Sequence, residues 1–185
     1  MKKPKIFPDI YIDSIYDVDF SALYNEGYRA VIFDVDNTLV PHGAPADDRA
    51  KKFFSYLNDC GFKALLLSNN KEPRVKSFSE DVIFSSYMFK AGKPNPKGYL
   101  KAVEKMGVKK EETLFVGDQI FTDIMGANYA GIRNIMVKPI LKWKEEIQII
   151  AKRFLEFIVL AAYRVYVRAG GETRPVPVVS QEPSP

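Results

Sequence analysis

Ala30-Val-Ile-Phe-Asp-Val-Asp-Asn-Thr38 is the stretch that decides the fold of this 185-residue chain. Four apolar residues, rich in branched and aromatic side chains, lead directly into a cluster of polar ones. This pattern is typical of a buried strand that ends at the edge of a sheet. Because the apolar run is continuous rather than alternating, we expect helices to cover both faces of the sheet.

The alternation of short apolar runs and longer helical stretches continues toward the C-terminus. Further strands are predicted at 63–67, 82–84, 113–116 and 134–137. Helices are predicted at about 50–60, 73–79, 96–106 and 120–130. Strands that alternate with helices in this way predict an α/β fold with a doubly wound, mostly parallel sheet.

Three segments are distinguished along the chain. Residues 1–140 are predicted to form a single domain, with segment 1–28 packing on it. Residues 141–169 are predicted to form an extra amphipathic helix, because apolar residues recur there at helical spacing. Residues 170–185 contain four prolines and little that could be buried, so we expect a disordered tail.

Composition and charge exclude several classes of protein. The formal net charge of +4 is too small an excess to indicate a nucleic-acid-binding protein, so no nucleic acid is expected as a specific partner. Cys60 is the only cysteine, which excludes an internal disulfide and favours a reducing compartment. We recognise no export signal and no stretch long enough to span a bilayer. The expected location is cytoplasmic, with peripheral membrane contact as an option.

Polar side chains follow the predicted strands at the positions where each strand ends. They are Asp34, Asp36, Asn37 and Thr38 after the first strand, Ser68, Asn69 and Asn70 after the second, Asp118 and Asp123 after the fourth, and Lys93 in the loop before the helix at 96–106. Because ligands of parallel α/β sheets bind beyond the carboxyl ends of the strands, we expect these side chains to converge on one edge.

The charges of this predicted site indicate an anionic ligand and a hard cation. Two carboxylates about 4 Å apart repel one another by roughly 4 kcal/mol at an effective dielectric constant of about 20, so several acids and a phosphate need positive charge among them. Mg²⁺ prefers carboxylate and phosphate oxygens, and Lys93 can supply a second positive charge. The absence of histidine and cysteine from the predicted ligands argues against zinc and copper.

These motifs resemble those of the haloacid dehalogenase superfamily. The motifs are Asp34-Val-Asp36-Asn-Thr38, Ser68, Lys93-Pro94, and Gly117-Asp118 with Asp123, in that chain order. The resemblance covers about residues 29–138 and implies a Rossmann-like core. Pro8-Asp-Ile-Tyr11 and Ser14-Ile-Tyr-Asp17 look more narrowly like the YqeG-type phosphatases, which are akin to the phosphatidylglycerophosphate phosphatases of mitochondria.

The resemblance implies a Mg²⁺-dependent phosphomonoester hydrolase that acts through an aspartyl-phosphate. It implies that Asp34 is the nucleophile and that Asp36 is the general acid and base. It also implies phosphate-binding roles for Ser68, Asn69 and Lys93, and metal-binding roles for Asp34, Asp118, Asp123 and the backbone carbonyl of Asp36. Superfamily members without an acid at the position of Asp36 tend to be dehalogenases or ion-pumping ATPases, so Asp36 favours hydrolysis of phosphomonoesters.

The spacing between the motifs bears on the size of the substrate. Only one helix and one strand fit between Asp36 and Ser68, and again between Ser68 and Lys93, so a mobile cap domain of the superfamily has no room. An open site cannot exclude water around a small substrate, which favours a large one, such as a phospholipid with a head-group phosphate like phosphatidylglycerophosphate. The alternative enzyme is a nucleotidase or sugar-phosphate phosphatase. Alternatives of another class are a phospho-accepting receiver-like domain and a catalytically dead scaffold.

The predicted C-terminal helix allows two interpretations. Its apolar side is wider than a surface helix needs, and most of its charged residues gather opposite. In one interpretation, the helix packs on the sheet or against a second copy in a homo-oligomer. In the other, segment 141–168 lies in a membrane interface, with Trp143, Tyr163 and Tyr166 at the boundary.

Other residues have a plain structural interpretation. Asp118 taken alone would be a good helix cap. His42 lies in a Pro-Gly loop and is expected to be solvated, with its role left open. Cys60, at a predicted helix end, is expected in the core.

Overall fold

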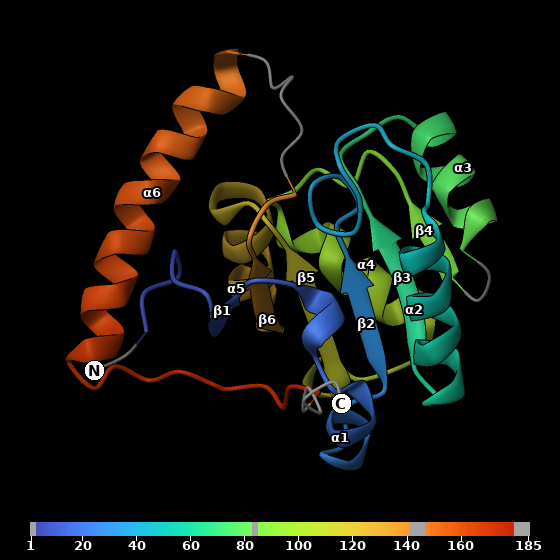
Figure 1. Cartoon of the computed structure of the whole chain (residues 1–185), viewed down its shortest axis with the longest axis horizontal. Helices are drawn as coiled ribbons and strands as arrows, with labels where there is room; N and C mark the ends of the chain where they lie inside the picture. Colours follow the sequence, from blue (N-terminus) through green and yellow to red (C-terminus); the bar gives the residue numbers. More distant parts are fainter. Residues whose placement is uncertain (1–2, 83–84, 141–146, 180–185) are drawn as a thin grey trace, which may run out of the picture.

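A six-stranded sheet forms the centre of the computed structural model, which describes residues 3–82, 85–140 and 147–179 (Figure 1). The strands are β1 (Ile10–Ile12), β2 (Ala30–Phe33), β3 (Lys63–Leu67), β4 (Ser85–Met88), β5 (Thr113–Gly117) and β6 (Arg133–Val137). Their order in the sheet is β1-β6-β5-β2-β3-β4, and all neighbouring pairs are parallel. The predicted α/β class with a parallel sheet is confirmed.

Helices cover both faces of this sheet. The first face carries α1 (Phe20–Asn25), α2 (Asp48–Asp59) and α3 (Glu72–Asp81), and the second carries α4 (Pro96–Met106) and α5 (Met125–Ala130). Successive strand residues point to opposite faces, so Val31 and Phe33 belong to the first core, whereas Ala30 and Ile32 belong to the second. Burial on both faces explains why β2 is continuously apolar.

Local sequence sets the ends of the helices. The side chain of Asp47 accepts a hydrogen bond from a backbone N–H in the first turn of α2. Asn95 does the same for α4, whose first residue is Pro96, and Gly107 ends α4 with a φ of 63° in the left-handed region. Cys60 ends α2 from a half-buried position beside the core, rather than within it.

Two strands differ from the prediction. The strand predicted at 82–84 is found at Ser85–Met88, because Val82 still donates its backbone N–H to the carbonyl of Phe78 and so closes α3. Residues 83–84 lie outside the described residues. The three-residue strand β1 is absent from the prediction, and it pairs with β6 at the edge of the sheet.

The helix α6 (Ile147–Arg168) lies along the side of the molecule, beyond β1 and α5 (Figure 1). Its Tyr163 and Tyr166 pack against Phe7, and the ring centroids are 5.6 and 5.3 Å from that of Phe7. Among the described residues, none of the helices combines the length and the apolar content that crossing a bilayer requires.

Part of the expected disordered tail is ordered. The backbone N–H of Arg174 donates to the carbonyl of Asp9 at 3.0 Å, and the N–H of Asp19 donates to the carbonyl of Pro177 at 2.9 Å. Val176 is buried in the core formed with α1. The expectation of disorder is therefore wrong for residues 172–179, because backbone hydrogen bonds and a buried valine hold them on the N-terminal segment.

Two expectations concern residues outside the described ranges. They are the start of the C-terminal helix at 141–146, with Trp143 at its membrane boundary, and the end of the tail at 180–185.

Candidate active site

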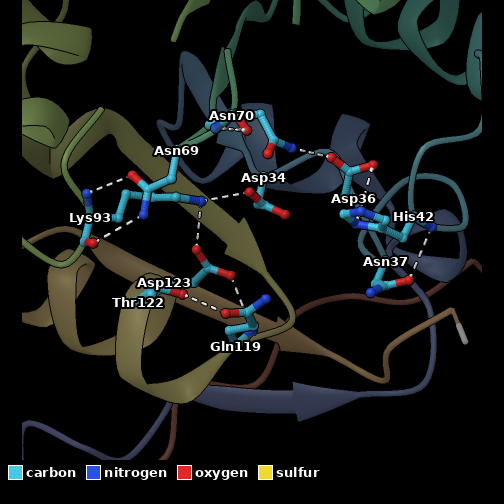
Figure 2. Close-up of a pocket in the computed structure, with 11 residues that line it drawn as sticks. Asp34, Asp36, Asn37, His42, Asn69, Asn70, Lys93, Gln119, Thr122 and Asp123 are labelled. Carbon is cyan, nitrogen blue, oxygen red and sulfur yellow. Dashed lines mark hydrogen bonds and ion pairs between the residues drawn. The ribbon is translucent and has the colours of Figure 1, made fainter. Parts of the chain in front are cut away.

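The register of the sheet brings the predicted site residues to one edge. Phe33 at the end of β2 lies opposite Leu66 of β3 and Val116 of β5. Asp34 follows β2, Ser68 follows β3 and Gly117 ends β5, so the three residues lie at nearly the same height on neighbouring strands. A cavity of about 120 Å³ opens at this edge (Figure 2). It is lined by Asp34, Asp36, Asn37, His42, Ser68, Asn69, Asn70, Lys93, Gln119, Thr122 and Asp123.

Lys93 bridges two acids at the floor of this cavity. Its buried ammonium Nζ lies 2.6 Å from Oδ1 of Asp34 and 2.7 Å from Oδ1 of Asp123. Burial works against the charge of Lys93, but the two carboxylates outweigh this effect and raise the pKa of the ammonium above its ordinary value. Lys93 is thus a fixed positive charge.

Asn69 holds the backbone on either side of that lysine. The N–H of Lys93 donates to Oδ1 of Asn69 at 2.8 Å, and Nδ2 of Asn69 donates back to the carbonyl of Lys93 at 3.1 Å. Ser68 is buried against the cavity, and its hydroxyl oxygen accepts the backbone N–H of Asn70. The two loops that follow β3 and β4 are locked together in this way.

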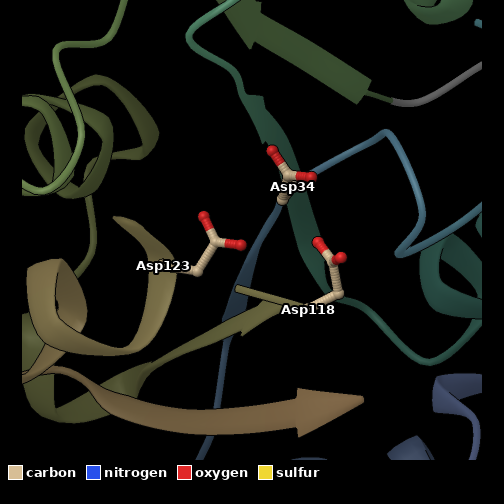
Figure 3. Close-up of side chains that lie close together, drawn as sticks. All are labelled: Asp34, Asp118 and Asp123. Carbon is tan, nitrogen blue, oxygen red and sulfur yellow. The ribbon is translucent and has the colours of Figure 1, made fainter. Parts of the chain in front are cut away.

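Three carboxylates gather beside Lys93. Oxygen atoms of Asp34, Asp118 and Asp123 lie within 4.8 Å of one another, and all three residues are buried (Figure 3). The hydroxyl of Thr38 donates to Asp118 at 3.3 Å. The carboxylate of Asp36 is not part of this cluster.

The donor set fits a hard divalent cation. Carboxylate oxygens are the ligands that Mg²⁺ and similar ions prefer, and a buried group of three is strongly repulsive without a cation. The ammonium of Lys93 pairs with Asp34 and Asp123, and the guanidinium of Arg74 pairs with Asp36. The residues present could therefore hold a divalent metal ion.

Burial and the neighbouring carboxylates disfavour the charged form of Asp34. Burial raises the pKa of its carboxyl to about 7, and the neighbouring charges of Asp123 and Asp36 add to the effect. The ammonium of Lys93 opposes the shift but does not cancel it. Added positive charge at this site would therefore favour the ionised form of Asp34.

The chain after β5 is shaped to place Asp123 in the cluster. The segment Ile120–Ile124 forms a π-helical turn before α5, where the sequence predicts an ordinary helix. The backbone N–H of Gln119 donates to Oδ2 of Asp123 at 3.0 Å. A β-carbon on Gly117 would lie only 2.6 Å from the side chain of Asp123, so glycine is required at the end of β5.

Asp36 has its own set of partners on the other side of the cavity (Figure 2). Its Oδ1 accepts the backbone N–H of Gly43 at 2.7 Å and Nη2 of Arg74 at 2.8 Å, and its Oδ2 accepts Nδ2 of Asn70 at 2.6 Å. The imidazole of His42 is half-exposed with Nδ1 3.9 Å from Asp36, so its position agrees with the predicted solvated loop.

Two further residues, Asn70 and Arg74, complete the site around Asp36. The sequence motifs point to Asn70 but not to Arg74. Asn70 adjoins Ser68 and Asn69 in the sequence, so its position already pointed to the site. Arg74 lies one turn into α3, and nothing in its spacing distinguishes it from other surface cations. Only the fold shows that its guanidinium reaches Asp36.

Comparisons with known proteins agree with this geometry. The sequence profile "haloacid dehalogenase-like hydrolase" matches residues 42–131, which begin after Asp34 and Asp36. The probable phosphatase YqeG of Bacillus subtilis is 36% identical over 141 residues, or 76% of this chain and 81% of that protein.

More distant relatives extend the likeness. The phosphatidylglycerophosphate phosphatase 1 of Arabidopsis thaliana is 26% identical over 179 residues, which cover 89% of this chain and 49% of that protein. The chain thus spans about half the length of the plant relative. A crystal structure that is 17% identical superposes with a TM-score of 0.53 over 74% of this chain and 84% of the other, which shows a shared fold. On the identity and coverage shared with the Bacillus protein, the chain belongs to the haloacid dehalogenase-like hydrolases and is a phosphatase related to YqeG.

Proposed function

We propose that this phosphatase hydrolyses phosphomonoesters in a Mg²⁺-dependent reaction, through an aspartyl-phosphate on Asp34. The observation that carries the proposal is the position of Lys93, whose ammonium lies between Asp34 and Asp123 at the floor of a small polar cavity. A phosphoryl group in this cavity would meet a nucleophile, a fixed positive charge and a site for a metal ion.

In the first half-reaction, a carboxylate oxygen of Asp34 attacks phosphorus. The bond from phosphorus to the leaving oxygen breaks, and Asp36 donates a proton to that oxygen. Lys93 and the hydroxyl of Ser68 bind the phosphoryl oxygens, and Asn69 keeps Lys93 in place. A Mg²⁺ ion held by Asp34, Asp118, Asp123 and the backbone carbonyl of Asp36 would supply positive charge that offsets the phosphoryl oxygens.

In the second half-reaction, Asp36 takes a proton from water. The water oxygen attacks phosphorus, the bond to Asp34 breaks, and inorganic phosphate leaves. Asp34 returns as a carboxylate and Asp36 returns as an acid, so protons and bonds balance over the cycle. The three hydrogen bonds from Gly43, Asn70 and Arg74 orient Asp36 for both transfers.

The dimensions of the cavity favour a large substrate. Pockets that enclose a whole small molecule usually measure about 300–1,000 Å³. The cavity here measures about 120 Å³, so it accommodates a phosphoryl group and leaves the rest of the substrate outside. Together with the likeness to a phosphatidylglycerophosphate phosphatase over 89% of the chain, this supports a phospholipid with a head-group phosphomonoester as the substrate.

The first test is hydrolysis of p-nitrophenyl phosphate with and without Mg²⁺. We expect Mg²⁺-dependent turnover in the wild type and a loss of at least about 10³-fold in Asp34→Asn, because the nucleophile is gone. Asp59→Asn, an exposed change at the end of α2, is the matched control and should match the wild type. Turnover by Asp34→Asn at the wild-type rate would contradict the mechanism.

The second test compares substrates under the same conditions. Phosphatidylglycerophosphate in mixed micelles is expected to give a higher kcat/KM than nucleoside monophosphates or sugar phosphates. A preference for nucleotides or sugar phosphates would overturn the lipid assignment but leave the mechanism intact.

A further inference from the structure

The outward side of α6 is apolar. The most exposed large side chains on it are Phe154, Phe157 and Val165, at 66%, 62% and 65% exposure. Leu155 and Ile158 are also more than half exposed. We call these five residues, with Arg164 and Arg168, the outer face of α6. Six of the eleven exposed large hydrophobic residues in the described part of the chain lie on this one helix.

The opposite side of α6 is firmly docked on the domain. Glu156 is buried, and its Oε1 accepts the backbone N–H of Ile120 at 2.7 Å. Tyr163 and Tyr166 are buried against Phe7, as described above. Because these contacts fix the rotation of the helix, the apolar residues of the outer face point away from the domain and are exposed.

The charges on the outer face have one sign. Between 154 and 168 the charged residues are Glu156, Arg164 and Arg168, and Glu156 is on the docked side. Both arginines are exposed, and no ion pair joins either of them to an acid within the described residues. They also border an open groove of about 400 Å³ between α6 and β1, whose other lining residues are Ile10, Tyr11, Tyr163, Val167 and Thr173.

We propose that the outer face of α6 docks on the surface of an anionic lipid bilayer. The apolar side chains would enter the boundary between head groups and acyl chains, and Arg164 and Arg168 would meet lipid phosphates. From 154 to 168 the helix is about 22 Å long at 1.5 Å per residue, enough to lie in the plane of the interface. The proposal concerns binding only, and it stands apart from the proposed catalytic mechanism.

Charge complementarity favours a bilayer over a second copy of the chain. A twofold pairing would place the same face of a second copy against this one, and the outer face offers no acid to pair with Arg164 or Arg168. An anionic bilayer supplies the opposite charge as well as an apolar layer. An anionic bilayer therefore matches both the positive charge and the apolar side chains of the outer face.

Vesicle flotation tests the proposal on the full chain. We expect the wild type to float with phosphatidylcholine vesicles that contain phosphatidylglycerol, and to float much less with phosphatidylcholine alone. Asp34→Asn should float like the wild type, because binding does not need turnover. A wild type that stays at the bottom of the gradient with both vesicles would overturn the proposal.

Variants separate the outer face from the rest of the surface. The double change Phe154→Ser with Phe157→Ser should lower the bound fraction by about tenfold or more, because two exposed apolar anchors are lost. Arg164→Glu with Arg168→Glu should give a similar loss. Leu100→Ser on α4, and Lys51→Glu with Lys52→Glu on α2, make the same kinds of change at exposed sites elsewhere and should bind normally.

Two further measurements separate loss of bilayer binding from misfolding and from self-association. Hydrolysis of p-nitrophenyl phosphate should be unchanged in the outer-face variants, which shows that they are folded. Light scattering reports the oligomeric state of the wild type and of the phenylalanine variant. A wild-type oligomer that dissociates in this variant, with no flotation of either protein, would assign the face to a second copy and overturn the bilayer proposal.

Discussion

At the scale of single residues, Arg74 has the least expected position in the site. Its guanidinium donates to the carboxylate of Asp36 at 2.8 Å, next to the amide of Asn70. Because Arg74 does not line the cavity, we assign it a positioning role that acts through Asp36. The motifs point to Asp34, Lys93 and the acids proposed to bind a metal. They do not point to Arg74, because its contact with Asp36 spans 38 residues and depends on the tertiary fold.

Replacing Arg74 should affect substrates with poor leaving groups most. Arg74→Met is expected to lower kcat by about tenfold or more on an alkyl phosphate, because the leaving alkoxide needs the proton of a well-oriented Asp36. p-Nitrophenyl phosphate, whose leaving group needs little protonation, should lose far less. The comparison of kcat on the two substrates is the readout, with Lys76→Met on the same helix as control. An equal loss on both substrates would argue against a role through Asp36.

Asp34 makes stability depend on pH when no metal is bound. Its folded-state pKa of about 7 lies above its ordinary value, so between that ordinary value and about pH 7 the folded protein holds a proton that the unfolded chain releases. The free energy of unfolding should therefore fall as pH rises through this window. Relative to Asp34→Asn, the wild type should lose about 2–4 kcal/mol between pH 4.5 and 7.5, as measured by urea denaturation in EDTA. If the free energy of unfolding changed equally with pH in the wild type and in Asp34→Asn, the raised pKa of Asp34 would be refuted.

At the scale of elements, the turn after β5 links the sheet to the cluster of Asp34, Asp118 and Asp123. Gly117 leaves room for Asp123, and the hydroxyl of Tyr99 on α4 reaches the carbonyl of Thr122 at 2.8 Å. Apolar periodicity predicts the existence of β5 and of the following helix. It does not predict the π-helical start, because that depends on contacts with α4 and with β5.

The glycine at the end of β5 can be tested directly. Gly117→Ala places a β-carbon where the side chain of Asp123 lies, so this acid must move out of the cluster. We expect the Mg²⁺ concentration for half-maximal activity to rise by about tenfold or more, with kcat partly restored at high Mg²⁺. Unchanged Mg²⁺ dependence would show that the contact is not critical.

The ordered part of the tail is a second element that the amino-acid composition does not predict. Prolines and short length suggest disorder, but Val176 is buried and the neighbouring backbone bonds to the N-terminal segment. Val176→Ser should lower the free energy of unfolding by about 1–3 kcal/mol, because a buried methyl pair is replaced by a hydroxyl. Val179→Ser, at a position 52% exposed, should change stability by less than about 0.5 kcal/mol. Thermal or urea unfolding measures both changes, and equal losses of stability in the two variants would contradict the packing of Val176.

At the scale of the whole molecule, topology explains why much of the site was predictable. In a parallel sheet all carboxyl ends lie at one edge, so polar residues after β2, β3 and β5 must meet whatever their separation in the sequence. Periodicity does not predict contacts between distant segments. The short strand β1, the ordered part of the tail and the docking of α6 all depend on such contacts. The molecule therefore combines the proposed active site at one edge of the sheet with an apolar helix on its flank.

Direct detection of the covalent intermediate tests the central claim. The protein would be mixed with substrate and Mg²⁺, quenched in acid, and treated with borohydride, which reduces an aspartyl-phosphate to homoserine. Peptide mass spectrometry is predicted to find this conversion at Asp34 alone, and to find more of it in Asp36→Asn, because the second half-reaction then lacks its base. Turnover with no modified Asp34 in either protein, or modification at a different aspartate, would contradict the account.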